Sequence, residues 1–288
     1  MTMQCNAFTE LKRSRRLKPY TKLCFRFLTY LRDKEDVKIF LEGYDMNERD
    51  YTFVEKPYMH RWKPEYMRSR LAQFYCFDDW AEQNPLPLTM LTFTTYHDNP
   101  YNKKVLTIEQ SWGQLKTGFR AASKLINAVK KSPYLWVVEP QPETGYPHIH
   151  AGYFTTFDEY ERDRLKNHWS RVLGVGDYKH GLDFAVDKEY RAGDISSLRN
   201  YLMKYLSKTF IDTIPEWTPQ ELVFNAVAWE NGYRFFGCSR DISAAMNPHN
   251  EIENDFVWLK TSLMGRGLSG EYLNIPVNVN PSFVQGNL

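Results

Sequence analysis

A short segment that alternates histidine with apolar residues constrains this chain most, because a period of two is typical of a β-strand. In Pro147–Phe154, one isoleucine separates His148 from His150. A strand would project both imidazoles from one face, roughly 6 to 7 Å apart, and would turn Ile149 and Ala151 towards the core. Two imidazoles so placed can converge on one metal ion. The alternative is a pair of partly buried histidines on a half-exposed strand.

The preceding segment supplies a carboxylate. Tyr134–Glu139 is apolar, β-branched and aromatic, which predicts a buried strand, and Pro140–Pro147 has the prolines and glycine of a turn. A hairpin would place Glu139 beside the two imidazoles. Such a mixed set of oxygen and nitrogen ligands suits Mg²⁺ or Mn²⁺ better than a structural zinc ion. Glu143, within the turn, is a competing third ligand.

The surrounding segments predict an α+β fold with a central antiparallel sheet flanked by helices. Leu88–Thr95 reads as a strand whose Thr92 and Thr94 share a polar face and could line the site. Apolar spacing or β-rich composition predicts the other elements. They are helices at Thr107–Lys130 and about Phe157–Val172, and strands at Leu182–Val186 and Tyr233–Cys238.

A breaker at Asn84–Pro87 suggests that a new domain starts near residue 86. We expect residues 1–85 to form a helical, basic N-terminal extension, with helical spacing at Lys34–Gly43 and Pro64–Glu82. Residues 86–245 would form the main domain. Residues 246–288 would be a C-terminal tail, partly disordered where Gly, Asn and Pro accumulate.

Composition narrows the class of protein. The 288 residues are 42% hydrophobic and 16% aromatic, enough for a substantial core. No apolar run approaches a membrane span and the N-terminus is polar, so an intracellular protein without membrane contact is expected. The four cysteines form no Cys-x-x-Cys pair and are expected to be free thiols.

The net charge of +2 is too small to indicate nucleic-acid binding by itself, but basic residues cluster near the start. This cluster could be a solvated tail or an arm that contacts phosphate. Its members are Lys12, Arg13, Arg15, Arg16 and Lys18.

A second informative element is an amphipathic helix starting at Asp194, which is a plausible N-cap. Tyr201 and Tyr205 would share one helical face, and Lys204 and Lys208 each follow a tyrosine by three residues. A phenol with a pKa of about 10 needs a cation to stabilise its phenolate before it can act as a nucleophile. The alternative is that both tyrosines cover the edge of the core.

Together these segments resemble the three motifs of the HUH endonuclease superfamily. The motifs are Thr92-x-Thr94, Pro147-His-Ile-His150 and Tyr201-Leu-Met-Lys-Tyr205-Leu-Ser-Lys208. Their order is similar to that of replication initiators (Rep proteins), and the paired tyrosines resemble initiators of single-stranded DNA phages and of archaeal plasmids and viruses. The resemblance covers about residues 88–240.

The resemblance implies a metal-dependent, site-specific nick in single-stranded origin DNA, for rolling-circle replication. Tyr201 or Tyr205 would form a 5′-phosphotyrosyl link, assisted by Lys204 and Lys208 and by Mg²⁺ or Mn²⁺ on His148, His150 and Glu139. The chain has no P-loop motif, so a host helicase and DNA polymerase would be partners. Residues that could hold DNA are Arg191, Arg199, Arg234 and Tyr153.

Two other classes of function remain open. A tyrosine transposase of the same superfamily would use the same residues and differ in its DNA ends. A DNA-binding protein without catalytic activity would carry the histidines incidentally.

Overall fold

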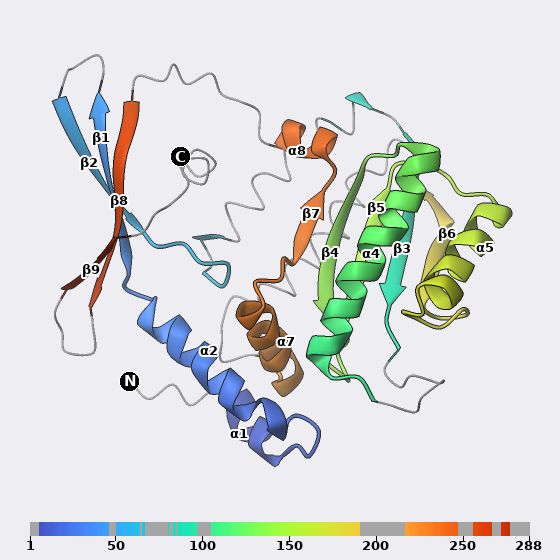
Figure 1. The fold of residues 1–288 in the computed structure, drawn as a ribbon, viewed down its shortest axis with the longest axis horizontal. Coiled ribbons are helices and arrows are strands. Elements are labelled where there is room, and N and C mark those ends of the chain that lie inside the picture. The colour runs from blue at the N-terminus through green and yellow to red at the C-terminus, as the bar shows by residue number, and fades with distance from the viewer. Residues whose placement is uncertain are drawn as a thin grey trace.

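The structure is a computed structural model that describes residues 6–45, 50–63, 65–66, 80, 83–84, 86–96, 105–190, 217–246, 256–266 and 272–276. These residues form two antiparallel sheets and several helices (Figure 1). The predicted α+β class is confirmed. Within the described residues, no helix combines the length and hydropathy needed to cross a membrane.

A five-stranded sheet forms the centre of the larger unit, in the order β6-β3-β5-β4-β7. The expected strands are all present, and every neighbouring pair is antiparallel. Their bounds are β3 Leu88–Thr94, β4 Tyr134–Pro140, β5 Pro147–Tyr153, β6 Leu182–Tyr190 and β7 Phe236–Cys238. The hairpin of β4 and β5 therefore lies inside the sheet, where both strands have two neighbours.

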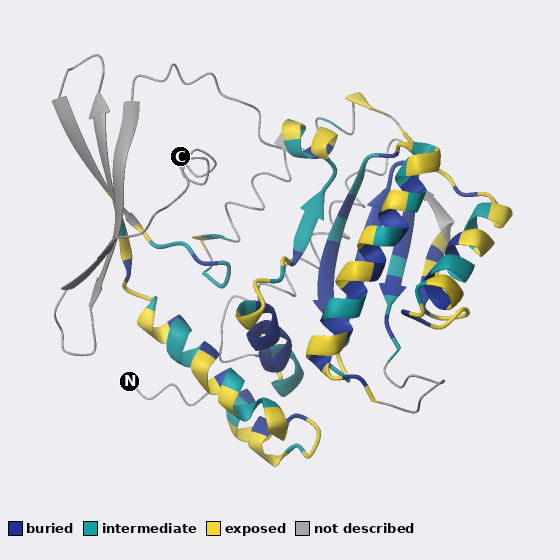
Figure 2. Ribbon diagram, viewed as in Figure 1, coloured by how far each residue is buried: buried dark blue, intermediate teal, exposed yellow. Residues whose placement is uncertain are grey.

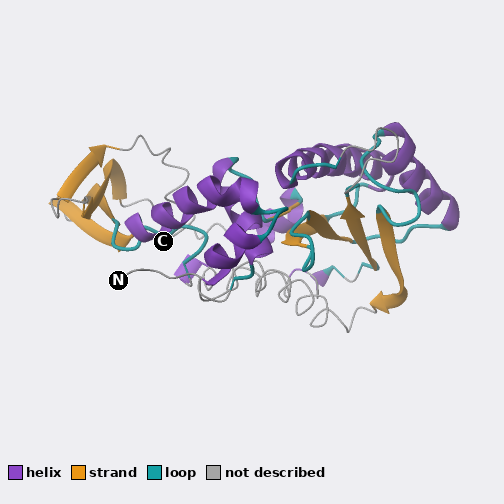
Figure 3. Ribbon diagram, turned by 90° about the horizontal axis from the view of Figure 1, so that it is seen from below, coloured by secondary structure: helices purple, strands orange, loops and turns teal. Residues whose placement is uncertain are grey.

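Helices α4 and α5 cover one face of this sheet (Figure 3). Helix α4, Ile108–Lys130, begins at a capping box in which Thr107 and Gln110 satisfy each other's backbone N–H groups. Its apolar stripe packs on the sheet, where Phe119 meets Phe93 edge-on with ring centroids 5.1 Å apart. Helix α5, Glu159–Asn167, continues into a π-helical turn, η2, at His168–Val172. The helices expected at Thr107–Lys130 and near Phe157–Val172 are confirmed.

Helix α7, Pro219–Glu230, was not expected from the sequence and is buried along most of its length. It contacts the N-terminal helix α2, Thr21–Asp33, and aromatic rings fill the space between them. Phe27 of α2 stacks on Trp217 at 5.8 Å and also meets Trp62 and Trp229. The N-terminal helices are thus anchored to the main unit by a shared core. Helix α1 spans Asn6–Arg13, η1 spans Lys18–Tyr20 and α8 spans Arg240–Met246.

The helical prediction for Lys34–Gly43 is wrong. Helix α2 ends at Asp33, and the chain continues as strands β1, Lys38–Asp45, and β2, Asp50–Pro57. Backbone pairing with distant strands overrides the weak helical spacing here. Most of Pro64–Glu82 lies outside the described residues.

The C-terminal tail also contains regular structure that its composition did not indicate. Strand β8, Phe256–Arg266, pairs with β1, and β9, Tyr272–Pro276, pairs with β8, giving a second sheet in the order β2-β1-β8-β9. The domain boundaries at residues 85 and 245 stay a prediction. The second sheet joins strands from both ends of the chain.

Candidate metal centre

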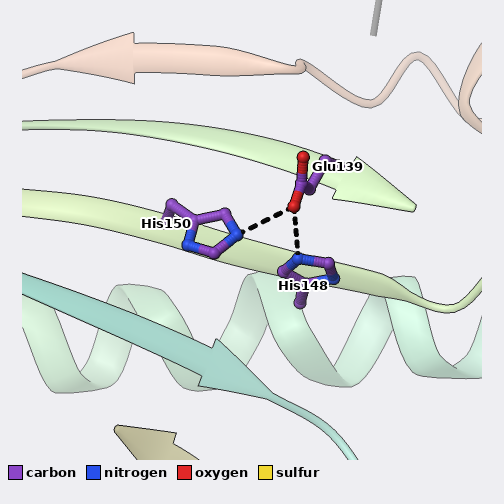
Figure 4. A group of neighbouring side chains, drawn as sticks. All are labelled: Glu139, His148 and His150. Carbon is purple, nitrogen blue, oxygen red and sulfur yellow. Dashed lines mark hydrogen bonds and ion pairs between the residues drawn. The ribbon is translucent and has the colours of Figure 1, made fainter. Parts of the chain in front are cut away.

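Glu139, His148 and His150 come together on the β4–β5 hairpin (Figure 4). Glu139 lies opposite His148 in the antiparallel register, and Val137 lies opposite His150. Nε2 of His148 lies 2.8 Å from Oε1 of Glu139, and Nε2 of His150 lies 3.0 Å from the same oxygen. The three side chains are buried, with exposed fractions of 6 to 8%. The predicted hairpin and the predicted shared face are both observed.

The turn between the strands fixes this register. The backbone N–H groups of Gln141 and Gly145 donate to Tyr146 and Gln141, which closes the chain reversal. Gly145 has a φ of 74°, where a side chain is strained, and an added Cβ would lie 3.1 Å from the backbone oxygen of Gln220. The glycine that marked the turn in the sequence is therefore needed by both conformation and space.

The carboxylate of this cluster is ionised at neutral pH. Burial alone would raise the pKa of Glu139, but hydrogen bonds and charge from the rings of His148 and His150 outweigh it and hold this pKa at about 2. The cluster therefore presents an anionic oxygen between two imidazole nitrogens, in a setting largely closed to water.

The geometry fits a divalent ion. Two ligands at right angles, each about 2.1 Å from a metal, lie about 3.0 Å apart, which is the separation found between Glu139 Oε1 and each histidine Nε2. These donors would leave other coordination positions to water and phosphate. The buried Nδ1 of His148 has no hydrogen-bond partner within the described part of the chain.

Thr92 supports the second histidine from the neighbouring strand. It lies opposite His150 in the pairing of β3 with β5, and its Oγ1 is 3.1 Å from Nδ1 of His150. If Nε2 binds a metal, Nδ1 carries the proton and donates to the threonine hydroxyl, which orients the ring. Thr94 lies opposite His148 in the same register. Thr92 thus lies where the sequence placed it, against the cluster.

The other site residues expected from the sequence separate into three groups. Glu143 is exposed in the turn and is not part of the cluster, so the geometry favours Glu139 as third ligand. Tyr153 was wrongly expected near DNA, because it is fully buried and its hydroxyl pairs with Ser123 at 2.7 Å. Several others lie outside the described residues: Arg191, Arg199, Tyr201, Lys204, Tyr205 and Lys208.

One contact near the hairpin was not anticipated. Arg16, from the basic N-terminal cluster, places its guanidinium 4.9 Å from the ring centroid of Tyr146, two residues before His148. The hydroxyl of Tyr146 donates to the backbone oxygen of Leu106. This part of the basic cluster is therefore packed against the turn of the metal hairpin. Only the charge cluster itself was visible in the sequence.

Comparison with known protein families gives one match. Residues 88–210 match a family model described as that of a replication-associated protein. The matched segment contains the whole metal cluster and Thr92, and it extends over both tyrosines of the expected helix. The match supports a replication initiator and a role in DNA replication. Searches of curated proteins and of solved structures returned no significant match.

Proposed function

We propose that this protein is a rolling-circle replication initiator of the HUH type. It would nick and rejoin single-stranded origin DNA at a specific site, using a divalent metal and a tyrosine nucleophile. The observation that carries the proposal is the buried Glu139, His148 and His150 cluster inside the segment that matches a replication-associated family.

The proposed chemistry is a transesterification. The phenolic oxygen of Tyr201 or Tyr205 attacks the scissile phosphorus, the bond to the 3′-oxygen breaks, and that oxygen leaves as a 3′-hydroxyl after taking a proton. One phosphodiester replaces another, so no external energy source is needed and the step can be reversed to rejoin the strand. A bound Mg²⁺ or Mn²⁺ supplies electrophilic polarisation of the phosphate and orients it.

Each protein group has a separate task in this proposal. His148, His150 and Glu139 hold the ion, and Thr92 keeps the ring of His150 in the binding orientation. Lys204 and Lys208 lower the phenol pKa by stabilising the phenolate. Two tyrosines are useful because the first is still joined to DNA when the second cut is due.

The partners follow from what the 288 residues contain. They include no P-loop motif for a helicase, so strand separation and synthesis are assigned to a host helicase and a host polymerase. The 3′-hydroxyl released by the nick would prime that synthesis.

A covalent-adduct assay tests the proposal. The full chain is incubated with Mn²⁺ and labelled oligonucleotides tiled across the replicon that encodes it, and denaturing electrophoresis detects protein joined to DNA. We expect an adduct with one oligonucleotide, and its loss with EDTA. A failure to form any adduct across the complete tiling would overturn the assignment.

The tyrosines are tested with the same oligonucleotide. Tyr201→Phe and Tyr205→Phe should each retain some cleavage, the double variant should retain none, and either single variant should fail to release closed circles. If Tyr201→Phe alone removes every adduct and Tyr205→Phe releases circles normally, the two-tyrosine mechanism is wrong although nicking itself stands.

A further inference from the structure

We propose that a groove between α4 and the outer part of the sheet binds a segment of single-stranded DNA, on the opposite face of the sheet from the metal cluster. The groove has a volume of ≈ 640 Å³. The choice of DNA among possible ligands rests on the proposed function, whereas the groove itself rests on its own geometry.

The alternation of side chains along β4 separates the two sites. Glu139 points to the metal face, while Tyr134, Trp136 and Val138 line the groove. On β5, Ile149 lines the groove between the two histidines. One hairpin thus carries metal ligands on one face and a floor of apolar and aromatic side chains on the other.

Basic side chains surround this floor. Lys116, Arg120 and Lys124 are spaced four residues apart, so they form a row along one side of α4 with steps of about 6 Å. Arg234 adds a fourth cation from the segment before β7, and no acidic residue lines the groove. All four are exposed, and none makes an ion pair with another residue in the described ranges. Figure 2 shows the exposed stripe of α4 beside its buried stripe.

Aromatic rings give the groove a surface for bases. Tyr134, Trp136 and Tyr233 are half-buried, so part of each ring is open to the groove. Tyr233 is held in place because it stacks on Trp112 at 4.9 Å and has the Lys116 ammonium 5.3 Å from its ring centroid. Base stacking on fixed aromatic rings, with cations for the phosphates, is how proteins hold single strands without reading sequence.

Unpaired polar atoms also line the groove. The indole N–H of Trp112, a residue only 3% exposed, has no hydrogen-bond partner among the described residues, and neither does the buried Oδ1 of Asn127. A buried donor and a buried acceptor without partners are costly unless a ligand or water satisfies them. The edge of a nucleobase offers both complementary groups.

The size and charge of the groove favour a strand over other ligands. Its volume lies within the roughly 300–1,000 Å³ of pockets that enclose small ligands, which is enough for part of a strand but not for a duplex. A ligand that is anionic along its backbone and aromatic in its side groups matches both parts of the lining. The groove would hold DNA remote from the cleavage site while the metal face acts on another segment.

Fluorescence anisotropy in EDTA, where no cleavage occurs, tests this inference on the full chain. The probes are labelled oligothymidylate and an abasic strand of equal length. The groove variant is Lys116→Gln/Arg120→Gln/Lys124→Gln, and its control, Lys166→Gln/Arg171→Gln/Lys179→Gln, removes equal charge from α5 and its neighbourhood. We expect the groove variant to bind oligothymidylate about tenfold or more weakly, with a salt slope reduced by about 2, and the control to bind normally.

A second variant tests the bases. Trp136→Ala should weaken oligothymidylate binding about tenfold and leave abasic binding unchanged, whereas Trp136→Phe should restore it. Thermal melting confirms that each variant is folded. Equal losses in the two charge variants, or normal binding by the groove variant, would overturn the inference.

The outcome is independent of nicking. A protein that forms no tyrosyl adduct yet loses strand binding in the groove variant would disprove the proposed function and keep the groove. A protein that nicks and whose groove variant binds normally would do the reverse.

Discussion

The two glutamates near the metal hairpin differ in their surroundings by more than their four-residue separation suggests. Glu139 is 6% exposed and accepts hydrogen bonds from both histidines, while Glu143 is exposed in the turn. We predict that Glu139→Ala weakens Mn²⁺ binding about tenfold or more, because it removes the anionic ligand, and that Glu143→Ala leaves it unchanged. Isothermal titration with Mn²⁺ measures both, and a larger loss in Glu143→Ala would reverse the ligand assignment.

The histidines should separate metal binding from DNA binding. His148→Ala or His150→Ala removes one nitrogen donor, so we expect nicking with Mn²⁺ to fall below detection. Strand affinity should change less than about threefold, since phosphate contacts elsewhere supply it. Adduct formation and anisotropy on the same preparations compare the two properties. Nicking at the wild-type rate by either variant would show that the site is misassigned.

Thr92 acts through His150 and should therefore have a smaller effect. Thr92→Val keeps the shape of the side chain but removes the hydroxyl 3.1 Å from Nδ1 of His150, so Mn²⁺ affinity should fall roughly 10- to 100-fold. Thr94→Val, on the same strand, is the matched control and should retain affinity. A 10- to 100-fold loss in the control as well would indicate disturbance of β3 rather than loss of the hydrogen bond.

How much of the site is predictable follows from which residues are local. The hairpin brings Glu139 opposite His148 because a period of two and one turn determine that register. The same period places Tyr153 with Ile149 and Ala151, on the side away from the histidines. Tyr153 was misassigned because its aromatic character was weighed above its position. The contact of Arg16 with Tyr146 joins segments 130 residues apart, which no local pattern encodes.

At the scale of elements, the loop after β2 carries a histidine that should make stability depend on pH. His60 is 8% exposed, and its Nδ1 accepts a hydrogen bond from the backbone of Trp62 at 3.3 Å. Burial, helped by the charge of Lys63, lowers the pKa of His60 from 6.5 to about 4. Between these values the unfolded chain binds a proton that the folded chain does not, so stability falls as the pH drops from 6.5 to 4.

The contribution is at most roughly 2 kcal/mol after allowance for partial solvent screening. We predict that His60→Asn, which cannot titrate but keeps an acceptor near Nδ1, loses less stability than the wild type on acidification. Urea unfolding at pH 7 and pH 4.5 measures the difference. His180→Asn, at an exposed turn, is the control, and an identical pH dependence for His60→Asn and wild type would contradict the assignment.

The elements that the sequence misjudged are those stabilised by distant partners. Strand β3 and helix α4 were predictable because composition, capping and apolar spacing agree within each segment. Strand β1 has no such agreement, and its neighbour β8 lies more than 200 residues along the chain. Its strand conformation is determined by that pairing rather than by local preference.

At the scale of the whole molecule, the pairing of β1 with β8 links the two ends of the chain in one sheet. Without β8, β1 would retain β2 alone, and an isolated two-stranded hairpin is at best marginally stable in water. We predict that a chain ending at Met246 shows much faster amide exchange over Lys38–Asp45. Exchange in β3 and β5 should stay slow, because the five-stranded sheet contains no strand from beyond that point.

Hydrogen-exchange mass spectrometry compares the two sheets in a single experiment. A chain ending at Pro276 keeps both β8 and β9 and is the matched control, so its β1 should exchange as slowly as in the full chain. Unchanged protection of β1 in the chain ending at Met246 would mean that β8 does not stabilise it. Loss of protection in β3 and β5 as well would mean that the two sheets unfold as one cooperative unit, and that the C-terminal strands support the metal hairpin.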